Sequence, residues 1–128
     1  MEDPLRKLAL ADGRYAPEAF RFLLEGLEVA IEHTGRAEKE GPDRHVTGRE
    51  VLDGLVVRGR STFGPLTPRV WRSWGVRQTL DWGHIVFLMV EGGMLNRRES
   101  DSIDDFASDL DFEHEFVEAY EPRLPDAL

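Results

Sequence analysis

The sequence predicts a mainly α-helical protein that folds as a single domain over residues 1–128. The length is typical of one domain, and a chain of this size buries enough apolar surface to fold without a disulfide or a metal. Apolar residues make up 41% of the chain and charged residues 32%, as in proteins with a buried core and a charged surface. In most segments the apolar residues recur at helical spacing, and proline or glycine marks the segment ends.

The N-terminal region, residues 1–45, is expected to hold two helices and a polar loop. A short helix over Leu5–Ala11 precedes a longer one that begins at Pro17, because proline suits a first helical turn, and ends at Thr34. Residues 35–44, GRAEKEGPDR, have the composition of a solvent-exposed loop. The apolar face predicted for the longer helix consists of Phe20, Leu23, Leu24, Leu27 and Ile31.

Three further helices are predicted between residues 46 and 106. Thr47 and Glu50 have the spacing of a capping box at the start of the first of them. Gly54 and Gly59 in the same helix each cost about 1 kcal/mol relative to alanine, which is either tolerated or marks the close approach of a second helix. The three helices are expected over Thr47–Phe63, Pro68–Trp74 and Leu80–Gly92.

The segment Met94–Phe106 leaves room for a small β-hairpin after the third of these helices. Three tightly joined helices followed by a hairpin is the order of a winged helix-turn-helix, so residues 46–106 predict a winged-helix-like core. The third helix lacks the surface of a DNA-reading helix, because it has no arginine or lysine between Leu80 and Gly93. Its apolar residues point in nearly every direction around the axis, which predicts a helix buried on most sides.

A last helix is expected over residues 107–121. Phe112, Phe116 and Tyr120 recur every four residues and predict docking by one aromatic edge. Pro122 ends this segment, and residues 122–128 have the position and composition of a loose tail.

Four phrases of the sequence carry a family resemblance that runs from about Asp12 to Tyr120. They are DGRYAPEAFRFLLEGLEVA, RHVTGREVLDGL, FGPLTPRVWRSWGV and IVFLMVEGGML, the last followed by DF and DFEHEF. Together they resemble a small family of uncharacterised bacterial proteins. The resemblance implies a short, stand-alone bacterial protein and carries no activity, cofactor or catalytic residue.

The net charge of −9 is unevenly distributed along the chain. Residues 44–77 carry seven arginines against Glu50 and Asp53, giving +5, whereas residues 99–128 carry eleven acidic residues against Arg123, giving −10. The overall acidity disfavours non-specific binding to duplex nucleic acid. The chain has no cysteine, its N-terminus lacks a secretory apolar region, and its longest strongly apolar run, Ile85–Val90, is too short for a membrane span. A cytoplasmic location without membrane contact is therefore expected.

No catalytic residue, cofactor or metal site is predicted from motifs. The glycines form no phosphate-binding loop, and the serines lie in no nucleophile motif. His114 and Glu118 have the helical spacing of a metal-binding pair, but a competent site needs at least three ligands. Glu99, Asp101, Asp104 and Asp105 belong to an acidic stretch without the residue order of a calcium loop.

The best candidate for a partner-binding surface is the arginine-rich middle of the chain. Arginine beside tryptophan is a frequent combination at protein interfaces and also a stacking surface for single-stranded nucleic acid. The alternative is that the tryptophans pack in the core while the arginines are merely solvated. The residues concerned are Arg58, Arg60, Arg69, Trp71, Arg72 and Arg77.

The function predicted from these features is that of a non-catalytic protein-interaction or regulatory module, which docks a protein partner or a second copy of itself. A nucleic-acid-binding protein that uses the arginine-rich segment, with the acidic C-terminal region folded over it or swung away, is the alternative. A small-molecule or metal-dependent enzyme is a second alternative, and no motif supports it.

Overall fold

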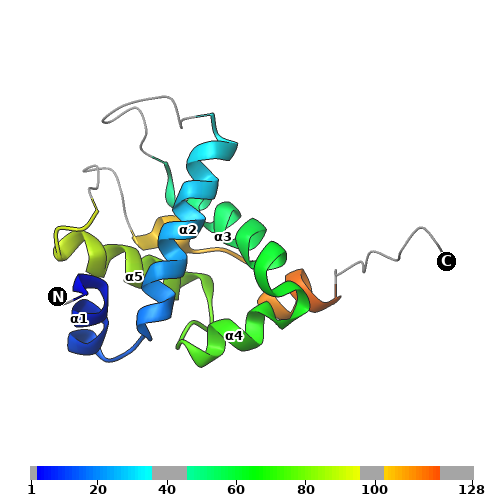
Figure 1. Ribbon diagram of the computed structural model, residues 1–128. Helices are drawn as coiled ribbons and strands as arrows, with labels where there is room; N and C mark the ends of the chain where they lie inside the picture. Colours follow the sequence, from blue (N-terminus) through cyan, green and yellow to red (C-terminus); the bar gives the residue numbers. More distant parts are fainter. Residues whose placement is uncertain (1–2, 36–45, 96–102, 119–128) are drawn as a thin grey trace.

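The computed structural model describes residues 3–35, 46–95 and 103–118, and its helices are drawn in Figure 1. Most of these residues are helical, which confirms the mainly α prediction. The α-helices are α1 (Pro4–Asp12), α2 (Pro17–His33), α3 (Gly48–Phe63), α4 (Thr67–Ser73) and α5 (Thr79–Glu91). Short helical turns complete the described chain, namely η2 (Gly64–Leu66), η3 (Ile103–Phe106) and η4 (His114–Glu118).

Local signals in the sequence account for where the helices begin and end. At α3 the Glu50 N–H donates to Thr47 Oγ1 at 3.1 Å and the Thr47 N–H donates to Glu50 Oε1 at 2.9 Å, so the predicted capping box is confirmed. At α1 the Asp3 carboxylate accepts the N–H of Leu5 at 3.0 Å, a cap that the sequence analysis did not include. Gly13, with a φ of 82°, ends α1 in the left-handed region that glycine favours.

Helix α2 lies at the centre of the fold, where it contacts α1, α3 and α5 (Figure 1). Its most extensive contact is with α3, and the two backbones meet at a pair of glycines. A Cβ atom added to Gly54 would lie 2.3 Å from the backbone oxygen of Gly26. Of the two interpretations of Gly54, close approach of a second helix is therefore confirmed.

The buried face of α2 differs from the predicted one. Phe20 and Leu23 are buried as expected, but Leu24, Leu27 and Ile31 are only half-buried. Because α2 and α3 approach so closely, the middle of their interface accepts small side chains in place of large ones. The other buried positions of α2 are Ala19, Phe22, Gly26 and Ala30.

Helix α5 is covered on most sides, as predicted. Trp82, Ile85 and Met89 are fully buried, and no residue from Thr79 to Val90 is exposed. Helix α2 and the turn η3 both pack against α5. This helix therefore contributes to the core.

The predicted β-hairpin is not confirmed. Residues 96–102 lie outside the described residues, and the described part of Met94–Phe106 contains the 3₁₀ turn η3 in place of a strand. Phe106 fills a slot between two glycines: added Cβ atoms on Gly48 and Gly83 would lie 2.9 Å and 3.0 Å from its side chain. The turn η3 thus connects α3 to α5 through a buried aromatic ring.

One aromatic core joins the helices of the N-terminal region, residues 1–45, to those of residues 46–106. Phe22 of α2 packs against Trp71, Trp74 and Trp82, with ring centroids 5.5 to 6.2 Å apart. Phe63 of α3 stacks on Phe22 as well, with ring centroids 5.7 Å apart, so α3, α4 and α5 share one aromatic core with α2. In the described part of the chain, every helix is too short or too polar to cross a bilayer.

Candidate functional site

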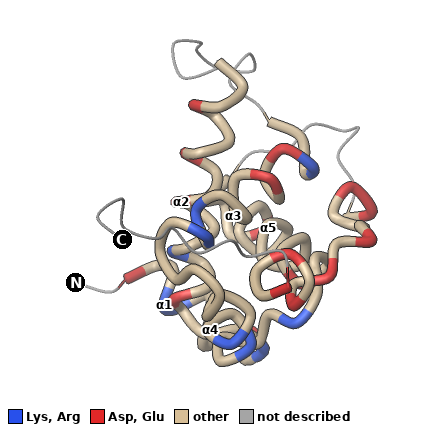
Figure 2. The backbone as a smooth tube through the Cα atoms, turned by 90° about the vertical axis from the view of Figure 1, so that its right-hand side faces the viewer, with Lys and Arg blue, Asp and Glu red and all other residues tan. Residues whose placement is uncertain are grey.

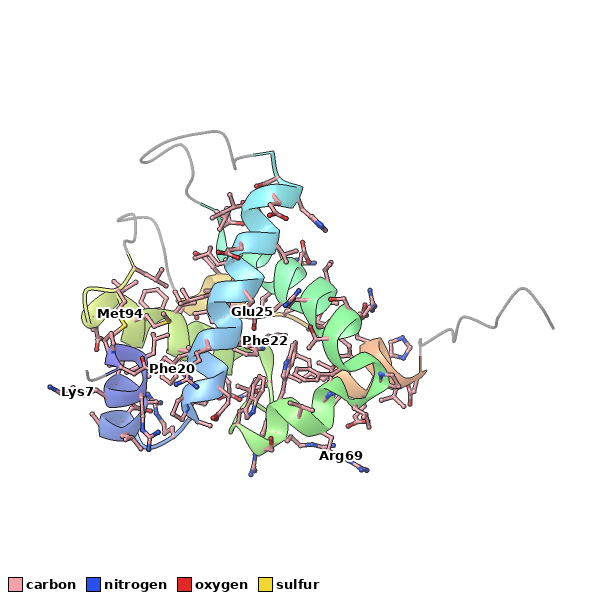
Figure 3. All side chains as sticks on the ribbon, viewed as in Figure 1. Lys7, Phe20, Phe22, Glu25, Arg69 and Met94 are labelled. Atoms are coloured by element: carbon pink, nitrogen blue, oxygen red, sulfur yellow. The ribbon has the colours of Figure 1, made fainter. Side chains whose placement is uncertain are left out.

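The predicted arginines are carried by α3, α4 and the turn before α5. We call this surface the arginine face and define it by Arg58, Arg60, Arg69, Arg72 and Arg77. Figure 2 shows basic positions along α4, and Figure 3 shows the side chain of Arg69 pointing away from the fold. Arg60 and Arg72 pair with neighbouring carboxylates, Glu115 and Glu113, and Arg72 and Arg77 line the same depression.

Part of the arginine face is paired with the chain's own carboxylates. Arg58 donates to Glu25 of α2 at 2.8 Å, Arg72 donates to Glu113 at 3.0 Å, and Arg60 forms an ion pair with Glu115. All of these side chains are partly exposed to solvent, so each pair contributes at most about 1 kcal/mol to stability.

The other two arginines are available for an external partner. Arg69 and Arg77 are exposed, and neither side chain forms a hydrogen bond or an ion pair with another described residue. They lie at either end of α4. The backbone N–H of Arg77 donates to Asp81 at 2.8 Å, which fixes the main chain and leaves the guanidinium in solvent.

Trp71, predicted together with these arginines as a partner-binding residue, is buried in the described conformation, as the alternative of a tryptophan packed in the core expects. Its side chain is 1% exposed and lies at the centre of an aromatic cluster. Its ring centroid lies 5.1 Å from that of Trp82, 4.9 Å from that of Phe112 and 5.2 Å from that of Phe116, in edge-to-face contacts. A residue so placed contributes apolar burial to the core, and an external molecule can reach it only after the segment that covers it has moved.

The segment that covers Trp71 is the acidic C-terminal region, and we call residues 107–118 the C-terminal arm. Residues 107–111 are not helical, and the rest of the arm makes a short helical turn with a π-helical end. Phe112 and Phe116 are buried, at 7% and 1% exposure, which confirms the predicted docking by an aromatic edge for these two residues. The third aromatic residue of that prediction, Tyr120, lies outside the described residues.

An open depression of about 320 Å³ marks the border between the arm and the arginine face. The charged part of the lining consists of Arg72, Arg77, Asp111 and Glu113. The apolar part of the lining comes from Pro68, Leu110 and Phe112. The opposite charges of residues 44–77 and 99–128 were the sequence signal for this contact, and the structure brings parts of those two segments together.

A second polar cluster joins the start of α2 to α5, and the sequence analysis missed it. The Tyr15 hydroxyl donates to Asp81 Oδ1 at 2.7 Å and lies 3.2 Å from His84 Nδ1. Because the hydroxyl has one proton, His84 Nδ1 is then the donor to the hydroxyl oxygen. His84 is therefore a histidine at the edge of the core with its ring Nδ1 hydrogen-bonded. Tyr15 and Asp81 are 66 positions apart in the sequence, so no spacing pattern could have paired them.

Substitution of Tyr15 by phenylalanine is expected to lower the free energy of unfolding by about 1–2 kcal/mol at pH 7, because a buried hydrogen bond to a carboxylate is lost. Burial and the hydrogen bond to Asp81 raise the pKa of Tyr15 above its ordinary value of 10.0. The contribution of the hydroxyl is therefore complete below pH 10 and is lost as the pH rises toward the raised pKa.

Urea denaturation of both proteins from pH 7 to pH 11 measures this difference. The difference in the free energy of unfolding between wild type and Tyr15→Phe should be constant up to about pH 9 and should become smaller above pH 10. Equal stability of the two proteins at pH 7, or a gap that widens at high pH, would contradict the hydrogen bond to Asp81.

The histidine of the arm forms a pair with one carboxylate and no larger cluster. His114 Nδ1 lies 2.8 Å from Glu118 Oε2, and this hydrogen bond raises the pKa of His114 above its ordinary value. Among the described residues, no three side chains of histidine, aspartate or glutamate converge as metal ligands do. Glu99 and Asp101 of the acidic stretch lie outside those residues.

Comparisons of this chain with family models, with curated proteins and with solved structures gave no match. The resemblance to a small bacterial family thus stays a prediction, and the geometry of the arginine face is the basis for a functional proposal.

Proposed function

We propose that the protein is a non-catalytic interaction module whose arginine face docks an acidic segment of a protein partner. One observation carries the proposal: this face holds two carboxylates of the C-terminal arm, yet Arg69 and Arg77 stay exposed and unpaired among the described residues. Arginine suits such a surface because its planar guanidinium binds carboxylates through two parallel hydrogen bonds.

The surroundings of the two free arginines also favour a protein partner. The depression beside Arg77 combines charged walls with apolar lining from Pro68, Leu110 and Phe112. A mixed apolar and charged surface of this kind resembles the rim of a protein interface, where arginine is enriched. A winged-helix-like arrangement of α3, α4 and α5 as the scaffold of this face, and a cytoplasmic location, belong to the same proposal.

Charge reversal at the free arginines tests the proposal. The full chain carrying Arg69→Glu and Arg77→Glu is compared with wild type as bait, followed by cross-linking and mass spectrometry of the captured proteins. The control is Arg6→Glu with Arg49→Glu, which reverses two exposed arginines outside the arginine face. We expect the wild type and the control to capture a protein through an acidic segment, and the Arg69/Arg77 variant to capture at least tenfold less of it, the loss expected when about 1.4 kcal/mol of binding is removed.

Two results would overturn the proposal. One is that no captured protein depends on Arg69 and Arg77 while light scattering shows a monomer. The other is that a single-stranded oligonucleotide binds the wild type at low salt and loses binding in the same variant, since that outcome would make nucleic acid the partner.

A further inference from the structure

The C-terminal arm contacts the rest of the fold in the way a bound peptide contacts a receptor. Two aromatic side chains, Phe112 and Phe116, provide the buried centre of the contact. Ion pairs from Glu113 and Glu115 to arginines lie at its edge. A buried aromatic centre with a charged, solvent-exposed rim is the anatomy of a protein interface.

The receptor side of this contact belongs to α3 and α4. We define the arm-binding surface by Gly59, Arg60, Trp71 and Arg72. A Cβ added to Gly59 would lie 3.2 Å from the ring of Phe116, so the absence of a side chain there makes room for the ring. The Arg60 guanidinium carbon lies 6.0 Å from the centroid of the same ring. Aromatic recognition and charge recognition therefore occur at adjacent points of one surface.

Two features make the hold of the arm weaker than its buried rings suggest. The Trp71 indole N–H is buried without a hydrogen-bond partner among the described residues, which costs about 1–3 kcal/mol. The first part of the arm, residues 107–111, forms no helix and is exposed at Ala107, Asp109 and Asp111.

We propose, resting on the proposed function, that the C-terminal arm is an intramolecular ligand. The segment of the partner protein that binds at the same surface has the same kinds of side chains as the arm. The arm-binding surface then takes, from a partner protein, a segment with two aromatic side chains four positions apart and carboxylates between them. Binding of the partner displaces the arm, so the arm also limits access to the site. Arg69 and Arg77 extend the surface beyond the part that the arm occupies.

A synthetic peptide with the sequence of residues 108–118, SDLDFEHEFVE, serves as the probe. Its binding to the full chain is measured by fluorescence anisotropy. The tethered arm competes at an effective concentration on the order of millimolar, so the wild type should bind the peptide weakly. The full chain with Phe112→Ala and Phe116→Ala should bind it at least tenfold more tightly, and a control peptide with both phenylalanines replaced by alanine should not bind.

A second variant covers the case in which loss of both rings unfolds the protein. The chain has no cysteine, so Arg60→Cys with Glu115→Cys introduces the only two thiols. A short bismaleimide that bridges them fixes the arm on its surface. We expect the bridged protein to bind the peptide at least tenfold more weakly than the same protein without the bridge.

The outcomes separate this inference from the proposed function. Equal peptide affinity of the bridged and unbridged proteins, or absence of binding to either, would overturn the inference, as would equal affinity of wild type and a folded Phe112/Phe116 variant. If partner capture still depended on Arg69 and Arg77, the proposed function would stand without it. A wild-type dimer that becomes a monomer in the Phe112/Phe116 variant would also overturn it, in favour of arm exchange between two copies.

Discussion

Substitution of Trp71 by alanine is expected to lower the free energy of unfolding by about 3–5 kcal/mol, the range measured for buried tryptophan and phenylalanine. The indole contacts the rings of Phe22, Trp82, Phe112 and Phe116, so its removal leaves a cavity between α2, α5 and the arm. Native domains are stable by about 5–15 kcal/mol, and the variant should therefore lose a large part of its stability. Chemical denaturation followed by far-ultraviolet circular dichroism measures the loss.

Trp74→Ala is the matched control for Trp71→Ala. Trp74 follows α4 directly and contacts Phe22 and Phe63, but its side chain is only half-buried. Trp74→Ala should therefore lower the free energy of unfolding by about half as much as Trp71→Ala, or less, because less buried apolar area is lost. A Trp71 variant within about 1 kcal/mol of wild type, or less affected than the Trp74 variant, would contradict the central position of Trp71.

Substitution of Gly54 by alanine is expected to lower the free energy of unfolding by about 2 kcal/mol or more. Helix propensity alone predicts the opposite sign, since alanine is favoured over glycine by about 1 kcal/mol within a helix. The added methyl group would lie 2.3 Å from the backbone oxygen of Gly26 and 3.0 Å from the backbone nitrogen of Ala30. Backbone atoms cannot rotate away, so α2 and α3 must separate and lose packing along their contact.

The neighbouring position provides the control for this prediction. Asp53 is exposed on the same helical turn, so Asp53→Ala should change the free energy of unfolding by no more than about 0.5 kcal/mol. Urea denaturation of the two variants and of wild type distinguishes packing from propensity. An alanine at position 54 that left stability unchanged or raised it would refute the close contact with Gly26.

Only part of the contact between the C-terminal arm and the arginine face could be predicted from patterns in the sequence. The arginines and the opposite charges of two segments were visible in the sequence, and so was the spacing of Phe112 and Phe116. The burial of Trp71 could not be decided from the sequence, because composition cannot distinguish a tryptophan on the surface from one beneath a docked segment. The assignment of pairs, such as Arg72 with Glu113 across 41 positions, depends on how the helices pack.

Local physical chemistry was sufficient for the helices and several of their ends. The capping box of Thr47 and Glu50, the proline at the start of α2 and the apolar circumference of α5 each act within a few residues of chain, and a sequence displays them directly. Three features depend on residues that are distant in the sequence, and only the tertiary structure decided them. They are the small side chains between α2 and α3, the hydrogen bond from Tyr15 to Asp81, and the packing of the arm against Trp71. These contacts join residues from different helices, so their energies exist only when the helices are already in place.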